Sequence, residues 1–444
     1  MNRPRQVAVV GGGWAGCAAA AKLAAAGIAV TLIEASADLG GRARRVELDF
    51  DGDRHVLDNG QHLLVGAYRA IARLLASLDV DIDAVVERRP FELRYPDGFR
   101  LQASGLPAPW HLATALLTAR GLTWAERGSM ARFLRALKAT EWRLAADRDA
   151  AGWLADHGQS ARLVARIWRP LGLAALNTPL QEASAQLLAN VLRDSLGADR
   201  DASMLWLPRA NLSALLPDAV ERFVLARGGA VRRGTRATSI AADGDRFRLD
   251  LAGGDGAETL RADAVVYAAP PAQLGRVAAA FTPALHDVLA TIARYAYEPI
   301  CTVYLKYPEG ADVPRGLVAL RDDPVVRAYG QWAFDRGALD PANRGVASVV
   351  ISAHGPHEDE SMHALCEAVA DQLRRQLGLP PPRAARVITE KRATLAARPG
   401  LQRPAQTTRV PGLVLAGDWT ASEYPSTLEA AVRSGEAAAS ALLQ

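Results

Sequence analysis

The chain has 444 residues, of which 50% are hydrophobic and 23% charged, so it is a folded globular protein rather than a disordered or fibrous one. A formal net charge of +4 is too small to indicate a nucleic-acid-binding protein. No apolar run reaches the roughly 18 residues that a membrane-spanning helix needs.

The chain opens with a strand, a glycine-rich turn, a helix and a second strand. Residues 7–10 form a short apolar run that continues into a GGGWAG turn, and an alanine-rich helix is predicted from about residue 17 to residue 26. A second strand over residues 29–33 ends at Glu34. This order within about 30 residues is the context that a dinucleotide-binding fingerprint requires.

The glycine spacing indicates that phosphate binds at the start of that helix. Gly11 permits the tight turn, Gly13 lets the backbone approach a pyrophosphate, and Gly16 lets helix and strand pack closely. Glu34 ends the second strand, where a carboxylate can accept hydrogen bonds from ribose hydroxyls. We therefore predict an adenine-dinucleotide site at this turn.

Two further segments predict a second contact with the same cofactor. Gly40, Gly41 and Arg42 follow the acid closely and can place backbone amides and a guanidinium around more phosphate and ribityl chain. Near the C-terminus, Asp418 follows a short strand at residues 413–416 and precedes an alanine-rich helix. Its carboxylate can accept hydrogen bonds from ribityl hydroxyls. Both ends of the chain are thus expected to hold one extended cofactor.

The middle of the chain is predicted to alternate between helical and strand-rich regions. Residues 85–200 show long helical periodicity, and strands return after residue 201. The expected elements are a helix at 212–226, strands at 230–240, 247–251, 262–270, 299–307 and 346–352, and a helix at 360–376. One fold element therefore occurs in pieces along the chain, which favours two discontinuous domains over three consecutive ones.

These motifs resemble those of the flavin-dependent amine oxidase and carotenoid desaturase superfamily, whose members carry the glycine fingerprint, a GGR segment and a C-terminal GD motif. A narrower resemblance rests on the sequence DNGQH at residues 58–62 and GAY at residues 66–68. Stretches around residues 168–179, 207–213 and 424–429 are similar as well. Over nearly its whole length the chain resembles the squalene-associated branch, the hydroxysqualene dehydroxylases (squalene-associated FAD-dependent desaturases).

The resemblance implies an α/β protein: a Rossmann-like FAD-binding domain of the amine oxidase and GDI-like fold, interleaved with a mixed helical and strand substrate domain. We expect the FAD-binding domain at residues 1–84, 201–275 and 405–444 and the substrate domain at residues 85–200 and 276–404. The expected FAD-binding residues are Gly11, Gly13, Trp14, Ala15, Gly16, Glu34, Gly41, Arg42, Asn59, Gly60, Ala237, Gly417, Asp418, Thr427 and Leu428.

The resemblance further implies that reduced flavin delivers hydride to hydroxysqualene, an allylic alcohol of a C30 isoprenoid, to give squalene and water in hopanoid synthesis. Because hydroxide is a poor leaving group, an acid must protonate the hydroxyl as the C–O bond breaks. The candidate catalytic residues are His62, Gln61, Tyr424 and Glu423. Gln61 and His62 can equally hydrogen-bond flavin edges or the backbone, and Asp58 is expected to cap a turn.

Three other functions are compatible with the same motifs. A phytoene-type carotenoid desaturase would move hydride from substrate to flavin. An amine oxidase usually needs a flavin-facing aromatic cage, for which only Tyr424 is an obvious candidate, and Cys366 lies far from Asp418, which argues against covalent flavin attachment. The Rab GDP-dissociation inhibitors share the fold without flavin chemistry, but they are expected to lack the cofactor-binding residues that this chain keeps.

Trp110, Trp124 and Trp142 in the helical region have two interpretations. They could form a lipophilic contact with a membrane interface. Tryptophan at helical spacing is more often core packing, and that interpretation is favoured here. Since a C30 isoprenoid substrate is almost insoluble in water, peripheral contact with a bilayer is still expected, together with contact to upstream squalene or phytoene synthase-like enzymes.

Neither a metal site nor a nucleic-acid partner is expected. His354 and His357 are three residues apart, but glycine and proline lie between them. The three cysteines have no CxxC spacing, which excludes a disulfide scaffold and a cysteine-rich zinc site and suits a reducing compartment. The glycines of the N-terminal turn would interrupt the apolar region of a signal peptide. We expect a cytoplasmic protein that touches the inner face of the cell membrane.

Overall fold

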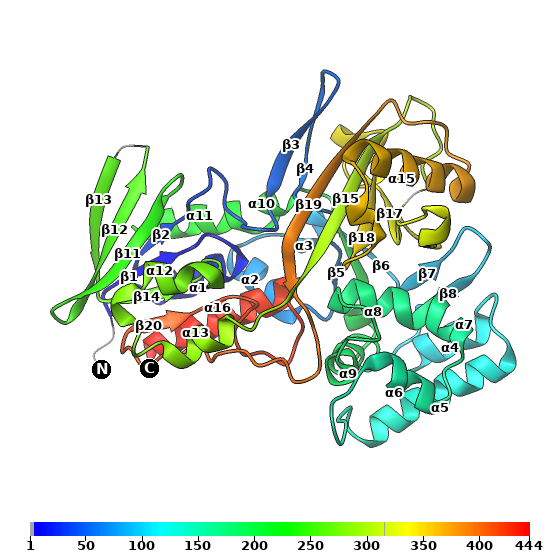
Figure 1. Cartoon of the computed structure of the whole chain (residues 1–444), viewed down its shortest axis with the longest axis horizontal. Helices are drawn as coiled ribbons and strands as arrows, with labels where there is room; N and C mark the ends of the chain where they lie inside the picture. Colours follow the sequence, from blue (N-terminus) through cyan, green and yellow to red (C-terminus); the bar gives the residue numbers. More distant parts are fainter. Residues whose placement is uncertain (1–3, 255, 315) are drawn as a thin grey trace.

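The computed structural model of the chain describes residues 4–254, 256–314 and 316–444. Its first sheet is parallel and has the order β10-β2-β1-β14-β20, so its strands come from the start, the middle and the end of the chain (Figure 1). The strands are β10 (Ala230–Arg232), β2 (Ala29–Ile33), β1 (Gln6–Val10), β14 (Ala264–Tyr267) and β20 (Leu413–Leu415).

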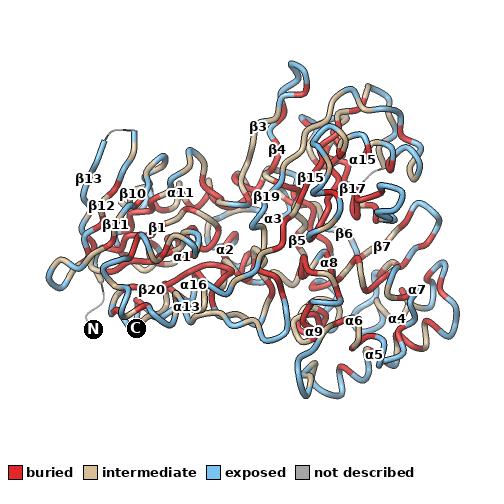
Figure 2. Tube along the Cα trace, viewed as in Figure 1, coloured by how far each residue is buried: buried red, intermediate tan, exposed pale blue. Residues whose placement is uncertain are grey.

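Both faces of this sheet are covered, because successive side chains of a strand point to opposite faces. Val7 and Val9 of β1 pack in one core with three helices: α1 (Trp14–Ala25), α11 (Pro217–Ala226) and α16 (Leu428–Leu443). Ala8 and Val10 pack in a second core against an antiparallel sheet of β11 (Arg236–Asp243), β12 (Arg246–Gly253) and β13 (Gly256–Ala262). Figure 2 shows that β1, β2, β14 and β20 lie almost wholly buried, whereas β10 at the edge of the sheet is only half-buried.

A second sheet of five antiparallel strands lies beside the first and has the order β16-β17-β18-β15-β19. Its strands are β16 (Leu317–Ala319), β17 (Trp332–Asp335), β18 (Val346–Ser352), β15 (Tyr297–Lys306) and β19 (Ala384–Leu395). One face packs on α15 (Met362–Leu377). The other face joins a large apolar core with a layer of helices, so the sheet stands between α15 and that layer.

The helical layer begins later than the sequence predicts. Residues 86–102 form β6 (Val86–Arg89), β7 (Glu92–Arg94) and β8 (Arg100–Gln102), so the prediction of helical periodicity from residue 85 is wrong there. Pro90, Pro96 and Gly98 interrupt this stretch and favour a hairpin. The helices that follow are α4 (Trp110–Thr118), α5 (Trp124–Ala139), α6 (Ala150–Asp156), α7 (Ala161–Leu163), α8 (Arg169–Leu176) and α9 (Ala185–Asp194).

Two other boundaries differ from the prediction for local reasons. The helix expected at 212–226 is divided into α10 (Leu212–Leu215) and α11, because Pro217 has no N–H to continue the ladder. The strand expected at 230–240 is also divided, with β10 in the parallel sheet and β11 in the antiparallel one. The α/β fold class is confirmed, whereas the assignment of residues to two domains stays a prediction.

The remaining elements connect these layers. A hairpin of β3 (Arg45–Phe50) and β4 (Asp53–Asp58) projects from the molecule (Figure 1). A small sheet joins β5 (Leu64–Val65), β9 (Leu205–Pro208) and β6. The short helices are α2 (Arg69–Ser77), α3 (Ile82–Val85), α12 (Leu274–Val277), α13 (His286–Ile292) and α14 (Arg336–Leu339). Across the described ranges, no helix has both the length and the apolarity needed to cross a membrane.

Candidate functional site

The glycine turn between β1 and α1 leaves room for a ligand at one of its three key positions. A Cβ at Gly11 would lie 2.7 Å from the backbone of Ala268, and one at Gly16 would lie 1.8 Å from the Gly11 carbonyl oxygen. A Cβ at Gly13 would meet only Gly41, at 3.9 Å. Gly13 also caps α1 without a side-chain hydrogen bond, so the first N–H groups of the helix can bind an anion there.

Glu34 lies beside this turn, as the spacing predicts. Its Oε2 accepts the N–H of Gly12 at 2.7 Å, and its Oε1 accepts the N–H of Ser36 at 2.8 Å. Each carboxylate oxygen keeps a second lone pair, so ribose hydroxyls can still donate to it. Trp14 is fixed in the same turn by the hydrogen bond from its Nε1 to the carbonyl of Ala43, at 3.1 Å.

Arg42 and Asp418 join the two ends of the chain. The Nη2 of Arg42 lies 2.5 Å from the Oδ1 of Asp418, and its Nη1 donates to the carbonyl of Ala393. Partial removal from water lowers the pKa of Arg42. The charge of Asp418, its hydrogen bond and the charge of Glu390 together raise that pKa by more, so the net shift is upward. The same loop contacts the glycine turn, where Gly40 donates to the carbonyl of Gly12 at 2.8 Å. Residues 40–42 and 418 therefore lie at one place beside the turn.

The DNGQH segment follows β4 and is held by the second sheet. Asp58 is buried, and its Oδ1 accepts the N–H of Leu212 at the start of the distant helix α10, at 2.7 Å, instead of an N–H of the adjacent turn. Burial raises the pKa of Asp58 to about 6. Gln61 is buried as well: its N–H donates to Thr302 Oγ1, and its Oε1 accepts from Ser348 Oγ at 3.0 Å. Its Nε2 donates to the carbonyl of His62 at 3.0 Å. Gln61 therefore positions the backbone of the segment.

His62 has one ring nitrogen paired and one available. Its Nδ1 lies 2.9 Å from the carbonyl of Gly60, and because a carbonyl only accepts, Nδ1 carries the proton. Its Nε2 has no hydrogen-bond partner in the described part of the chain. Burial lowers the pKa of His62 to about 4. The ring is therefore neutral at pH 7, and its Nε2 is a hydrogen-bond acceptor. At that pH about one ring in a thousand carries a second proton, on Nε2.

Tyr424 and Glu423, the other candidate acids, contact α9 instead. The Tyr424 hydroxyl donates to Asp194, and the ring of Tyr424 lies under the Arg433 guanidinium. Glu423 has a side chain that is 71% exposed and lies 3.4 Å from Arg193. Among the residues described, no hydrogen bond links either candidate to the DNGQH segment. The structure brings Gln61 and His62 together and places these two in a separate polar cluster.

Thr427 and Leu428 lie at the start of α16, where Thr427 caps the helix by accepting the N–H of Ala430. The middle of α16 packs closely on the start of α1, because a Cβ at Gly435 would approach the Ala15 carbonyl to 2.1 Å. Ala237 is a buried residue of β11, and its predicted contact with the cofactor stays a prediction.

Asn177, which lies in the segment 168–179 but had no predicted role, contacts the strands β15 and β19 and the residue that follows β18. It ends α8 in the left-handed conformation (φ 46°), donates to Thr394 Oγ1 and accepts the N–H of Ala353. An asparagine directly after a predicted helix is the signal that could have identified it. Thr302 and Ser348 were missed too, and their signal is a polar residue within an otherwise apolar strand.

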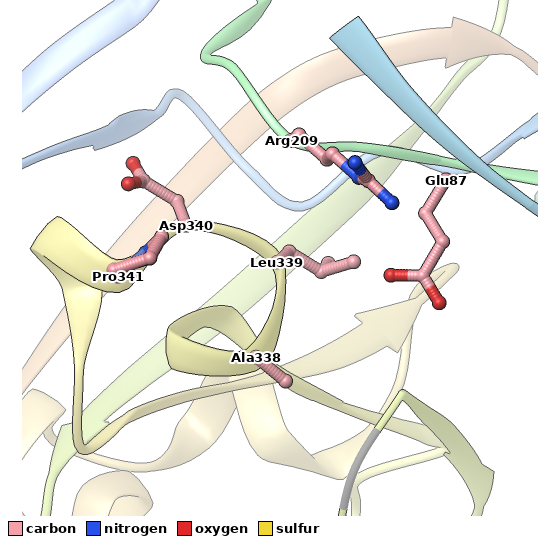
Figure 3. Close-up of a pocket in the computed structure, with 6 residues that line it drawn as sticks. All are labelled: Glu87, Arg209, Ala338, Leu339, Asp340 and Pro341. Carbon is pink, nitrogen blue, oxygen red and sulfur yellow. The ribbon is translucent and has the colours of Figure 1, made fainter. Parts of the chain in front are cut away.

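A separate cavity of about 420 Å³ lies beside α14 (Figure 3), and it is lined by Glu87, Arg209, Ala338, Leu339, Asp340 and Pro341. None of the predicted site residues lines it, so the candidate site does not include it. In the ranges that the structure describes, no group of three or more His, Cys, Asp or Glu side chains could hold a metal ion.

The parallel sheet, the uncapped glycine turn and the Arg42–Asp418 pair define a protein that binds a nucleotide-type cofactor. The chain belongs to the family of flavin containing amine oxidoreductases, whose model matches residues 14–443. It is therefore a flavin-dependent oxidoreductase, and the predicted superfamily is confirmed.

Relatives with curated names cover almost the whole chain. A hydroxysqualene dehydroxylase from Rhodopseudomonas palustris is 32% identical over 99% of this chain and 98% of its own length. A hydroxysqualene dehydroxylase from Sinorhizobium fredii is 29% identical, over 98% of both chains. A zeta-carotene desaturase from Synechocystis is 24% identical, over 99% of this chain and 97% of its own. The resemblance to the hydroxysqualene dehydroxylases is thus confirmed.

Solved structures confirm the fold. An oxidoreductase from Methanosarcina mazei superposes with a TM-score of 0.73 at 16% identity and covers 97% of this chain and 99% of its own. A putrescine oxidase solved with putrescine bound has a TM-score of 0.68 at 18% identity, over 99% and 98% of the two chains. At these identities the likeness concerns the fold alone.

Proposed function

We propose that this flavoprotein binds FAD and reduces hydroxysqualene to squalene with loss of water. The observation that carries the proposal is the setting of His62. Its Nε2, which has no hydrogen-bond partner among the described residues, lies in the segment that resembles the hydroxysqualene dehydroxylases. The next residue, Leu63, packs against the apolar core of the helical layer. An acid–base group thus borders an apolar region, as removal of a hydroxyl from a hydrocarbon requires. The full-length similarity to hydroxysqualene dehydroxylases supports the same substrate.

The residues present fit FAD. The space at Gly13 and the uncapped start of α1 suit a pyrophosphate, and Glu34 suits the adenosine ribose. Arg42 and Asp418 would hold the ribityl chain. When bound in its reduced form, FAD would supply the hydride.

His62 would supply the proton. In the balanced reaction the allylic C–O bond breaks, a C–H bond forms, and one hydride and one proton are consumed to give squalene and water. The imidazolium form of His62 would protonate the departing hydroxyl from Nε2. Its Nδ1–H would meanwhile keep its hydrogen bond to the carbonyl of Gly60. The surrounding apolar side chains would exclude water, which would otherwise capture the allylic cation.

An anaerobic experiment tests the reaction. The bound flavin is reduced without oxygen, hydroxysqualene is added in detergent micelles, and flavin reoxidation is followed by absorbance while squalene is measured. We expect reoxidation with one squalene formed per flavin.

Other outcomes would identify another function. If phytoene reduces the oxidised flavin and hydroxysqualene has no effect, the protein is a phytoene-type desaturase. Reduction of the flavin by an amine would identify an amine oxidase. A protein that stays colourless after reconstitution with FAD would favour a prenyl-binding function like that of the Rab GDP-dissociation inhibitors.

A further inference from the structure

The segment of residues 101–119 is uncharged and exposes large apolar side chains. It contains no Asp, Glu, Lys or Arg, and Arg100 and Arg120 flank it. The backbones of these two arginines hydrogen-bond to each other, so the segment is closed at its base. Trp110 is 62% exposed and Leu117 is 59% exposed, and both lie on the outer face of α4, seven residues apart. The core interpretation of Trp110 is therefore wrong, because His111 and Ala115 form the buried face.

The neighbouring helix α5 combines an exposed tryptophan with unpaired cations. Trp124 is 74% exposed, so the core interpretation fails for it too, whereas Trp142 is partly buried against the apolar core. At 100° per residue, Trp124 and Arg135 lie on the outward face of α5, while Met130, Phe133 and Leu137 face the core. The cations on that face are Arg127, Arg132, Arg135 and Lys138.

Among the described residues, no carboxylate pairs with Arg132, Arg135 or Lys138 on the outward face of α5. The acid of the helix is Glu126, which is buried and closes the capping box with Thr123. Arg120, Arg132, Arg135 and Lys138 form no ion pair within the described residues. The surface is therefore apolar and positive at once, which is the composition of interfacial helices that lie on anionic bilayers.

Arg127 joins the apolar and positive parts into one surface. Its guanidinium donates to the carbonyls of Leu117 and Ala119 at the end of α4, and it lies 4.5 Å from the ring centroid of Trp124. The Arg127 guanidinium thus bridges the Trp124 ring and the backbone of Leu117. Figure 1 shows α4 and α5 at the end of the molecule that is far from the β11–β13 sheet.

We propose that this surface, made by Leu106, Trp110, Leu117, Trp124, Arg132 and Arg135, docks the protein on an anionic lipid bilayer. This inference rests on the proposed function, which supplies the reason for docking. A C30 hydrocarbon alcohol resides in a bilayer, so the enzyme must bind its substrate there. The buried faces of α4 and α5 belong to one apolar core with Trp332 and Val350 of the second sheet, and Leu63 packs against that core. Apolar packing is thus continuous from the docking surface to His62.

Vesicle co-sedimentation of the FAD-loaded protein tests the proposal without substrate. The probes are vesicles of phosphatidylcholine with about 30% phosphatidylglycerol and vesicles of phosphatidylcholine alone. Comparing the two separates the contribution of lipid charge from that of apolar contact. We expect Trp110→Ser/Trp124→Ser to weaken binding to the anionic vesicles by about tenfold or more. We expect Arg132→Glu/Arg135→Glu to abolish the preference for anionic lipid, which high salt should also weaken in the unmutated protein.

Matched controls come from exposed residues elsewhere. Val325 and Met362 are 91% and 73% exposed, so Val325→Ser/Met362→Ser removes as much exposed apolar surface and should leave vesicle binding unchanged. Arg222→Glu/Arg294→Glu reverses two exposed arginines outside the surface, and it should weaken binding less than the α5 reversal does. Equal binding by the Trp110/Trp124 variant and the unmutated protein would overturn the proposal.

Light scattering separates docking from self-association. If the protein is a dimer that the Trp110→Ser/Trp124→Ser variant converts to monomers, and the dimer ignores vesicles, the surface is an interface between copies and the proposal is wrong. Turnover of hydroxysqualene in detergent micelles should be unchanged in this variant. Vesicle binding without turnover would contradict the proposed function alone, and turnover in micelles without vesicle binding would contradict the docking surface alone.

Discussion

The glycine turn and the DNGQH segment differ in how their residues are held. In the turn, Gly16 is required by the nearby carbonyl oxygen of Gly11, and Gly11 is favoured by its own positive φ of 107°. In the DNGQH segment, Gln61 is held by Thr302 and Ser348, which are more than 240 positions distant in the chain. Local constraints leave a spacing that a sequence displays, whereas distant partners leave none. Flavin binding at the glycine turn should therefore be most sensitive to changes that alter the backbone. Turnover should be most sensitive to changes in the side-chain chemistry of the DNGQH segment.

The largest effect is expected for Gly13→Val. Its backbone is extended (φ −69°, ψ 176°), and a Cβ meets nothing closer than 3.9 Å, so the chain should fold with a free energy of unfolding changed by less than about 1 kcal/mol. The added side chain fills the space that we assign to the pyrophosphate. We expect a folded protein that purifies without flavin, as measured by the visible absorption spectrum and thermal unfolding.

Gly16→Val is the matched control for that change. Its Cβ would lie 1.8 Å from the Gly11 carbonyl oxygen, so α1 and β1 would have to separate, and the protein should be lost to aggregation or proteolysis. If both variants bind flavin normally, the turn is not the pyrophosphate site.

The second-largest effect is expected for His62→Ala. This change removes the proposed acid and leaves the glycine turn and the Arg42–Asp418 pair intact. We expect bound flavin to be retained and turnover of hydroxysqualene to fall by about 100-fold or more. His62→Gln, which keeps a polar group but cannot become cationic, should be nearly as slow. Stopped-flow reoxidation of the reduced flavin measures both variants.

The pH dependence of the unmutated enzyme sharpens the test of His62. Burial lowers its pKa to about 4, so the protonated fraction rises about tenfold for each pH unit between 7 and 5. We expect kcat/KM to rise with it and the His62→Gln variant to lose this slope. The free energy of unfolding should fall over the same range. Below about pH 6.5 His62 is protonated in the unfolded chain, whereas in the folded protein it stays neutral until lower pH. A flat profile would leave His62 as a positioning residue.

A smaller effect is expected for Asp418→Ala. The change removes a charged acceptor of the proposed ribityl contact and leaves Arg42, which is partly exposed, without its carboxylate partner. We expect the dissociation constant for FAD to rise by about tenfold to 100-fold. Asp418→Asn keeps an oxygen acceptor and should lose less, which fluorescence titration of the apoprotein with FAD can measure. An unchanged dissociation constant in both variants would remove Asp418 from the site.

The sequence predicts the fold of the glycine turn and its flanking strands well and the rest unevenly, for the same reason. Glycine spacing and a terminal acid encode the turn at Gly11 locally, so the parallel sheet and α1 follow from them. The exposure of Trp110 and Trp124 could not be read from helical spacing, since periodicity gives two opposite faces and does not say which one is buried. The low pKa of His62 depends on burial by distant strands, and no local pattern encodes it.

Asn177 provides the last test of that distinction, because its contacts are distant but its backbone is locally coded. Asn177→Gly keeps the left-handed backbone and removes the bonds to Thr394 and Ala353, so the buried N–H of Ala353 loses its acceptor. We expect it to lower the free energy of unfolding by about 1–3 kcal/mol without loss of flavin. Asn177→Ala should cost about 1 kcal/mol more, because a residue with a Cβ is strained at φ 46°. Chemical denaturation of the unmutated protein and the two variants measures the free energy lost with the hydrogen bonds and the free energy lost to backbone strain. If glycine and alanine cost the same, the backbone conformation contributes nothing and the distant bonds alone fix this corner of the site.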